Sequence, residues 1–254
     1  MDVIIVDEPV DVDARLDALA RRYKRAGGLG IEVLNLIGGR AEGLLDQLPN
    51  AVRGGLEQAT TRALEQAMKA AHESRAIVPD QKGWLNSVAG AAMGAVGGMG
   101  GLPTALAELP VTTTLLLRVI QGVAVENGFD ASAQNVQFDC IQVFASAGPL
   151  EADDGADLGF ISARVTITGA AVHGVIAKVA PRLATVLGQK LAAQTVPVLG
   201  AVAGAATNYA YTSYYSEMAH VHFGLRKLSV DADVPLDVLV DALRQRVKHR
   251  DITA

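Results

Sequence analysis

GWLNSVAGAAMGAVGGMGGLPTALA, residues Gly83–Ala107, and LAAQTVPVLGAVAGAATNYAYTSYY, residues Leu191–Tyr215, are two long stretches without a single charged side chain. Each is long enough to cross a bilayer as a helix, which takes about 20 predominantly apolar residues. Both stretches also repeat glycine every four residues, at Gly90, Gly94, Gly98, Gly200 and Gly204. Because that spacing places small residues on one face of a helix, a neighbouring helix can pack closely against it.

Leu, Ile and Phe are sparse in both stretches, and Asn208 and four tyrosines dilute the second. Interior glycines also weaken a helix by roughly 1 kcal/mol each relative to alanine. We therefore predict a helical hairpin buried inside an all-α fold. Insertion into a membrane, shallow embedding at its surface, a conformational switch and an oligomer interface stay open as alternatives.

The composition narrows the class of protein. Half of the 254 residues are hydrophobic, yet only 4% are aromatic and 26 are glycine, which suits helices that pack by close backbone approach. Charged residues make up 19%, below the roughly 25% of ordinary soluble domains. The formal net charge of −5 argues against nucleic acid as a partner. The single cysteine, Cys140, fits a reducing compartment, and the acidic N-terminus is unlike a secretory signal, so we expect a cytoplasmic location.

The chain is predicted to be a multi-helix bundle with the two uncharged segments at its centre. Val78–Lys82 is the best linker candidate, and it divides an N-terminal helical region, residues 1–78, from a helical core, residues 79–254. The two parts are expected to form one continuous domain. Arg164–Thr168 is the strongest strand candidate, although a helix accommodates it equally well. Gly148–Gly159 is acidic and turn-rich, which is typical of a surface loop.

The N-terminal helices can be predicted in more detail. Asp11 to Asp13 are expected to cap a helix that runs to about Ala26, where Gly27 and Gly28 interrupt it. Residues 51–75 have a clear helical period. One apolar face is expected to contain Val52, Leu56, Ala59, Ala63, Ala67 and Ala70.

Further helices are predicted towards the C-terminus. Leu109 and Pro110 are expected to begin a helix that ends at Gly128. Ser132 is the candidate cap of the next helix. A last amphipathic helix, Leu236–Lys248, is expected to open after Val234 and Pro235.

Motifs for catalysis or cofactor binding are incomplete. Gly28-Leu-Gly30 lacks the remaining dinucleotide fingerprint, and the glycines before Pro103 lack the Lys-Ser/Thr pair of a P-loop. Glu217 and His220 have the Glu-x-x-His spacing of di-iron bundles, but no second copy exists in the sequence. His220 and His222 point in different directions on a helix, so one is expected to be buried and the other partly exposed. We therefore predict no cofactor and no metal site.

Two charges interrupt otherwise apolar sequence before and within a predicted helix. Glu108 precedes Pro110 and is expected to cap the helix N-terminus, while Arg118 could pair with a carboxylate from elsewhere or extend to the surface. A competing interpretation is that the protein is a hydrolase-like enzyme. It would need Glu108, Arg118, Asn208 and His222 to converge in one helical cleft.

The segments around the two uncharged stretches resemble the signatures of the EcsC protein family. Gly101–Asp130 has an acidic residue before Leu-Pro, a helix with an arginine, and a Gly-aromatic-Asp turn. Val196–Leu228 has a Pro-x-x-Gly-Ala segment, an Asn-aromatic pair and an Ala-x-x-His-Phe-x-x-Arg helix. The resemblance covers roughly Ala51 to Leu228. Its signature positions include Glu108, Pro110, Arg118, Pro197, Gly200, Asn208, His222, Phe223 and Arg226.

The resemblance implies a helical protein that associates with membranes, and it supplies no catalytic residue. We expect a non-enzymatic protein at or near the cytoplasmic membrane, peripheral or integral, that assists transport, secretion or membrane homeostasis. A membrane surface or a membrane protein is the expected partner, and homo-oligomers are allowed. A soluble partner-binding scaffold is the remaining alternative.

Overall fold

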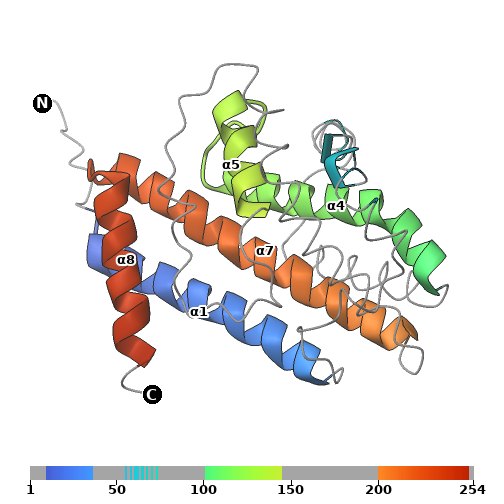
Figure 1. Cartoon of the computed structure of the whole chain (residues 1–254). Helices are drawn as coiled ribbons and strands as arrows, with labels where there is room; N and C mark the ends of the chain where they lie inside the picture. The colour runs from blue at the N-terminus through green and yellow to red at the C-terminus, as the bar shows by residue number, and fades with distance from the viewer. Residues whose placement is uncertain are drawn as a thin grey trace, which may run out of the picture.

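The computed structural model describes residues 10–36, 101–144 and 200–251, together with helical residues 55, 58, 60–62, 64, 65, 67, 70 and 73 (Figure 1). These residues form α-helices and no strand, which confirms the all-α prediction. The continuous helices are α1 (Val12–Leu36), α4 (Gly101–Glu126), α5 (Gln134–Phe144), α7 (Gly200–Asp231) and α8 (Leu236–Asp251).

The long helix α7 organises the bundle. It contains 32 residues, and it contacts α1, α4, α5 and α8. In Figure 1, α1 and α4 lie along α7, while α8 crosses its C-terminal end. Arg15 pairs with Asp231 and Arg22 pairs with Glu217, so positions rise along α1 as they fall along α7. The two helices are therefore antiparallel.

Two hydrophobic clusters lie along α7, the first from Tyr211 to Phe223 and the second from Val221 to Leu228. The first joins α7 to α4, α5 and the 55–73 segment, and its largest fully buried side chains are Tyr211, Tyr215, Phe144 and Phe223. The second joins α7 to α1 and α8 through Val221, Leu225, Leu228, Leu16, Leu19 and Leu239. Because α7 packs against several other helices, apolar side chains are needed on more than one side of it.

The described part of the second uncharged stretch lies inside this core. Tyr211 and Tyr215 are fully buried, Asn208 is 1% exposed, and only Tyr209, at 38%, reaches the surface appreciably. Burial is thus confirmed for most of the described side chains of the stretch, whereas Ala205, Ala206 and Ser213 are partly exposed. Of the first stretch, residues 101–107 form the beginning of α4, and the remainder lies outside the described residues. None of the helices in the described ranges combines the length and apolarity of a membrane span.

Asp11 caps α1 as predicted, because its Oδ1 accepts a 2.9 Å hydrogen bond from the Ala14 amide. The predicted interruption at Gly27 and Gly28 is wrong, since α1 continues to Leu36. The preceding turns of α1 pack against α7, and such tertiary packing outweighs the roughly 1 kcal/mol propensity penalty of a glycine.

The predicted start of α4 at Leu109 and Pro110 is also wrong, because the helix begins at Gly101. Pro110 lies inside it, although proline cannot donate to the carbonyl four residues earlier. Glu108 consequently lies in the third turn and cannot act as the N-cap of this helix.

The end of α4 follows the predicted chemistry. Gly128 has φ of 83°, and its amide donates to the Val125 carbonyl at 2.8 Å. The Phe129 amide donates to the Ala124 carbonyl at 3.0 Å, so both bonds of a Schellman motif are present. Ser132 is not the cap of α5, because Ala133 provides the first carbonyl acceptor. The Ser132 amide and hydroxyl instead donate to Asp130.

The helical prediction for residues 51–75 holds at every described position, but its buried face differs. Of the predicted apolar face, Ala67 is buried as expected and Ala70 is exposed, while Thr60 and Leu64, which the prediction does not include, are buried. The other four members of that face lie outside the described residues. So do the linker Val78–Lys82, the loop Gly148–Gly159 and the strand candidate Arg164–Thr168. The division into residues 1–78 and 79–254 stays a prediction.

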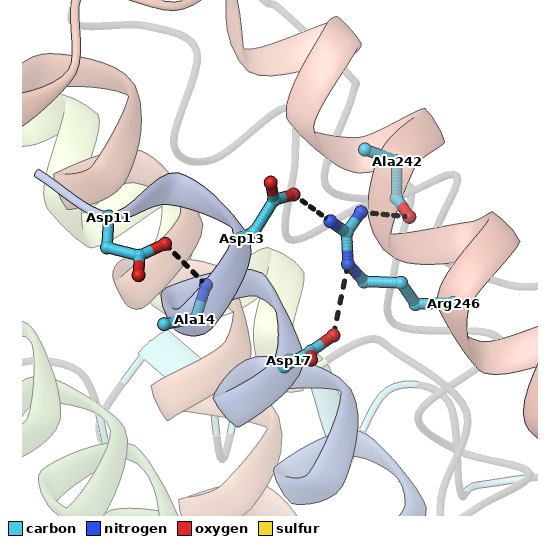
Figure 2. Close-up of polar contacts among 6 residues, drawn as sticks. All are labelled: Asp11, Asp13, Ala14, Asp17, Ala242 and Arg246. Carbon is cyan, nitrogen blue, oxygen red and sulfur yellow. Dashed lines mark hydrogen bonds and ion pairs between the residues drawn. The ribbon is translucent and has the colours of Figure 1, made fainter.

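Arg246 links α8 to α1 (Figure 2). Arg246 of α8 donates to Asp13 and, at 3.2 Å, to Asp17, which lie one turn apart on α1. Its third contact is the Ala242 carbonyl within α8, also at 3.2 Å. The predicted helix α8 is thus confirmed, and one of its basic residues connects two helices.

Candidate functional site

The family-like motif on α7 meets α5 at one carboxylate. His222 and Arg226 are four residues apart and share a helix face. Arg226 Nη1 donates to Asp139 Oδ2, and His222 Nε2 lies 3.5 Å from Asp139 Oδ1. The side chains of Asp139, Arg226 and His222 are 15%, 23% and 2% exposed. We call these three residues the Asp139 cluster.

Aromatic rings close the cluster on the side of the α4–α5 turn. The Arg226 guanidinium lies 4.6 Å from the centre of the Phe129 ring, within the range of a cation–π interaction. Phe129 also contacts Phe223, with ring centres 5.6 Å apart, and Phe223 meets His222 edge-on at 5.0 Å. The turn, α5 and α7 therefore converge on Arg226.

The arrangement indicates what these groups do. Arg226 neutralises the Asp139 carboxylate, and the two charges hold α5 against α7 in a partly desolvated site. A hydrogen bond between ionised groups is stronger than a neutral one. Within the described residues, the Asp139 cluster thus acts as a connection between helices.

A second group of charges lies between α7, α1 and the end of α4. Glu217 accepts from Arg22 at 2.9 Å and lies 3.5 Å from Arg25 Nη1. His220 Nε2 is 3.9 Å from a carboxylate oxygen of Glu126, the last residue of α4. Arg22 and Arg25 of α1 thus share one carboxylate on α7.

Burial lowers the pKa of His220 from 6.5 to about 4, with a further lowering by Arg22 that Glu217 partly opposes. The imidazole is therefore neutral at pH 7, and its contact with Glu126 is not an ion pair there. In the unfolded chain His220 takes up a proton near pH 6.5, whereas in the folded chain it stays neutral until the pH approaches 4. This part of the stability is complete above about pH 6.5 and is lost as the pH falls towards 4.

The Glu-x-x-His spacing of Glu217 and His220 does not lead to a metal site in the described residues. The Glu217 carboxylate already faces two arginines. The ranges that the structure describes contain no group of three His, Cys, Asp or Glu side chains that could hold a metal ion. One of the two histidines is buried and the other partly exposed, as predicted: the side chain of His222 is 2% exposed and that of His220 is 23% exposed.

The four residues of the hydrolase-like interpretation do not share one site. Asn208 and His222 both lie on α7, and 14 residues at 1.5 Å each place them about 21 Å apart along the axis. Glu108 and Arg118 are separated by about 15 Å along α4 for the same reason. Neither pair can be bridged by its side chains, so the enzyme interpretation loses the convergence it requires.

The remaining signature positions are distributed along two helices. Arg118 is partly exposed on α4, whereas Asn208 is buried, and its backbone carbonyl accepts from the Thr212 hydroxyl at 2.8 Å. Gly200 is the first residue of α7, and Pro110 lies within α4. Pro197 lies outside the described residues. Of the signature residues with described side chains, His222, Phe223 and Arg226 are brought together.

Asp139 is the residue that sequence reasoning missed. One signal was present, since Asp139 is the only charged residue in α5, QNVQFDCIQVF, whose other face is buried. A lone carboxylate in a short apolar helix requires a partner if it is largely desolvated. The identity of that partner, 87 positions along the chain, could not be read from the sequence.

Comparison with known proteins gives one match. A sequence model described as the EcsC protein family matches residues 50–228, which include α4, α5 and nearly all of α7. Neither the curated proteins nor the solved structures contain a match to the chain. Helices α1 and α8 lie outside the matched range, whereas every member of the Asp139 cluster lies within it.

Proposed function

This chain belongs to the EcsC protein family, and from that premise we propose that it is a non-enzymatic helical protein that acts at the cytoplasmic face of the membrane. Its role there would be to assist transport, secretion or membrane homeostasis. Its partner would be the membrane surface or a membrane protein. The scaffold would be the helical bundle, with α7 as its centre.

The non-enzymatic part of the proposal is supported by the contacts of the signature residues, which pack helices together. Arg226 and His222 face Asp139, and Phe223 packs against Phe129. These contacts fix the α4–α5 turn and α5 against α7. Residues that hold helices together in this way supply a rigid framework for binding.

The composition supports the membrane part of the proposal. Charged residues are only 19% of the chain, and half of all residues are hydrophobic. Most described side chains of the second uncharged stretch are buried in protein. A peripheral association, in which the bundle stays folded against the bilayer, is therefore the form we propose.

Cell fractionation tests this function with the full chain. We expect the protein in the membrane fraction and its release by an alkaline carbonate wash, as for a peripheral protein. Retention after the wash would replace peripheral by integral association. A protein found only in the soluble fraction, with and without crosslinking before lysis, would contradict the proposal and favour a soluble partner-binding scaffold.

A further inference from the structure

Positively charged side chains are concentrated on the outward face of α1, and the ion pairs between helices neutralise only some of them. Its apolar residues Leu16, Leu19 and Ala20 are buried against α7 and α8. Arg21, Arg22, Lys24 and Arg25 follow within five residues, and we call them the α1 basic band. At 100° per residue, Arg21, Lys24 and Arg25 fall within about 100° of one another, opposite the buried face.

Exposure distinguishes the members of the band. Arg21 is exposed, and it forms no ion pair within the described residues. The side chain of Arg25 is 57% exposed and that of Arg22 is 37% exposed, although both contact Glu217. One carboxylate therefore serves two arginines, and the band keeps an excess of positive charge.

The contacts of Arg246 matter for the charge of this face (Figure 2). Asp17 and Asp13 lie about one and two turns before Arg21 on the same side of α1. Arg246 of α8 binds both carboxylates. With that arginine in place, Arg21, Arg22, Arg25 and Arg246 face the carboxylates of Asp13, Asp17 and Glu217, so four cations meet three anions even when Lys24 is left out of the balance.

We infer that the α1 basic band binds the anionic headgroups of a phospholipid membrane and sets the orientation of the bundle on it. This inference rests on the proposed location at the membrane, and it concerns a helix outside the range of the family match. The reason is charge complementarity. The chain as a whole has a net charge of −5, so an anionic surface repels it except where a local band of cations faces the lipid.

Small residues extend the same face. Ala14 and Ala18 precede Arg21 at intervals of four and three residues, and Ala14 is exposed. These small side chains leave room for helix α1 to lie parallel to a surface, beside the Asp13 and Asp17 carboxylates that Arg246 binds. Anionic lipids attract such a band by about 1 kcal/mol for each Lys or Arg close to the membrane. Screening limits that attraction to about 8 Å at physiological salt.

Vesicle co-sedimentation of the full chain tests the inference. One probe is vesicles of phosphatidylcholine alone. The other is vesicles with about 30 mole per cent phosphatidylglycerol, which gives the membrane a strong negative surface potential. The test variant is Arg21→Gln, Lys24→Gln, Arg25→Gln. The control is Arg62→Gln, Arg244→Gln, Lys248→Gln, which removes the same charge; Arg244 and Lys248 lie on the face of α8 opposite Arg246.

We expect binding to the anionic vesicles that weakens as salt is raised, and little binding to phosphatidylcholine. The test variant should bind on the order of 100-fold more weakly, and the control within about threefold of the unmodified chain. Circular dichroism at roughly 222 nm, near the minimum of the α-helical spectrum, checks that both variants keep the helical content of the unmodified chain.

Three results would overturn the inference. Equal binding to both vesicle types, or equal binding of the test variant, would refute the basic band while leaving the membrane location intact. Absence of vesicle binding by a protein that still fractionates with membranes would point to a protein partner and would also refute it. Absence of vesicle binding together with a purely soluble distribution would remove the proposed function as well.

Discussion

Replacing Asp139 by Asn should loosen the contact between α5 and α7 without changing the shape of the side chain. The substitution removes the charge that Arg226 faces and leaves the aromatic contacts of Phe129 and Phe223 in place. A hydrogen bond between charged groups contributes roughly 1.5–3 kcal/mol. Breaking a fully buried pair costs about 3–5 kcal/mol.

The expected loss lies near the lower of these ranges. Arg226 is 23% exposed, so its guanidinium can recover part of its hydration, and its cation–π contact with Phe129 remains. We therefore expect the free energy of unfolding to fall by about 2 kcal/mol. For a chain of this size that corresponds to a decrease in Tm of roughly 4–8 °C.

Urea unfolding followed by circular dichroism at pH 7 measures this change. A double-mutant cycle with Arg226→Gln isolates the interaction, and its coupling energy should exceed about 1 kcal/mol. Asp241→Asn is the matched control, because the Asp241–Arg244 pair is exposed, at 68% and 31%, and should contribute less than about 0.5 kcal/mol. A loss at Asp139 no larger than that of the control, or a coupling energy of zero, would refute the structural role of the cluster.

Two further predictions concern the ends and contacts of α4. When the pH falls from 7 to 5, the free energy of unfolding of the unmodified chain should decrease by about 1–2 kcal/mol more than that of His220→Gln. The reason is that the low pKa of His220 lets the unfolded state, but not the folded state, take up a proton in this range. Urea unfolding at the two pH values measures both decreases, and an equal decrease for the two proteins would contradict the prediction. Gly128→Ala should destabilise the protein by about 1 kcal/mol, because φ of 83° strains any residue with a Cβ. Gly55→Ala provides the comparison, since Gly55 is helical, exposed and without a neighbour within 4 Å, and should be neutral or stabilising by up to about 1 kcal/mol. Destabilisation by both glycine substitutions to the same extent would contradict the backbone argument.

The family assignment rests on short sequence motifs, and the family match over residues 50–228 confirms it. The reason is that signature segments are contiguous, so their residues can be read without knowing the fold. The role of their polar residues was less accessible. Asp139, which both His222 and Arg226 face, lies outside both quoted segments.

The sequence by itself determined the features that depend on neighbours along the chain. The all-α class follows from helical periodicity, the Asp11 cap from a side chain that reaches an amide three residues on, and the α4 terminus from a glycine that tolerates positive φ. Such interactions span only a few residues, so their energy is a property of the local sequence.

The tertiary structure alone decided how far the helices extend and which charges meet. Helix α1 continues through Gly27 and Gly28, and α4 begins before Pro110, because the free energy of packing a helix exceeds the local penalty of such residues. Arg246 binds Asp13 and Asp17, and Arg226 binds Asp139, across large separations in the chain. A carboxylate can pair with any exposed cation that the fold brings near, so only the packing of the helices selects its partner.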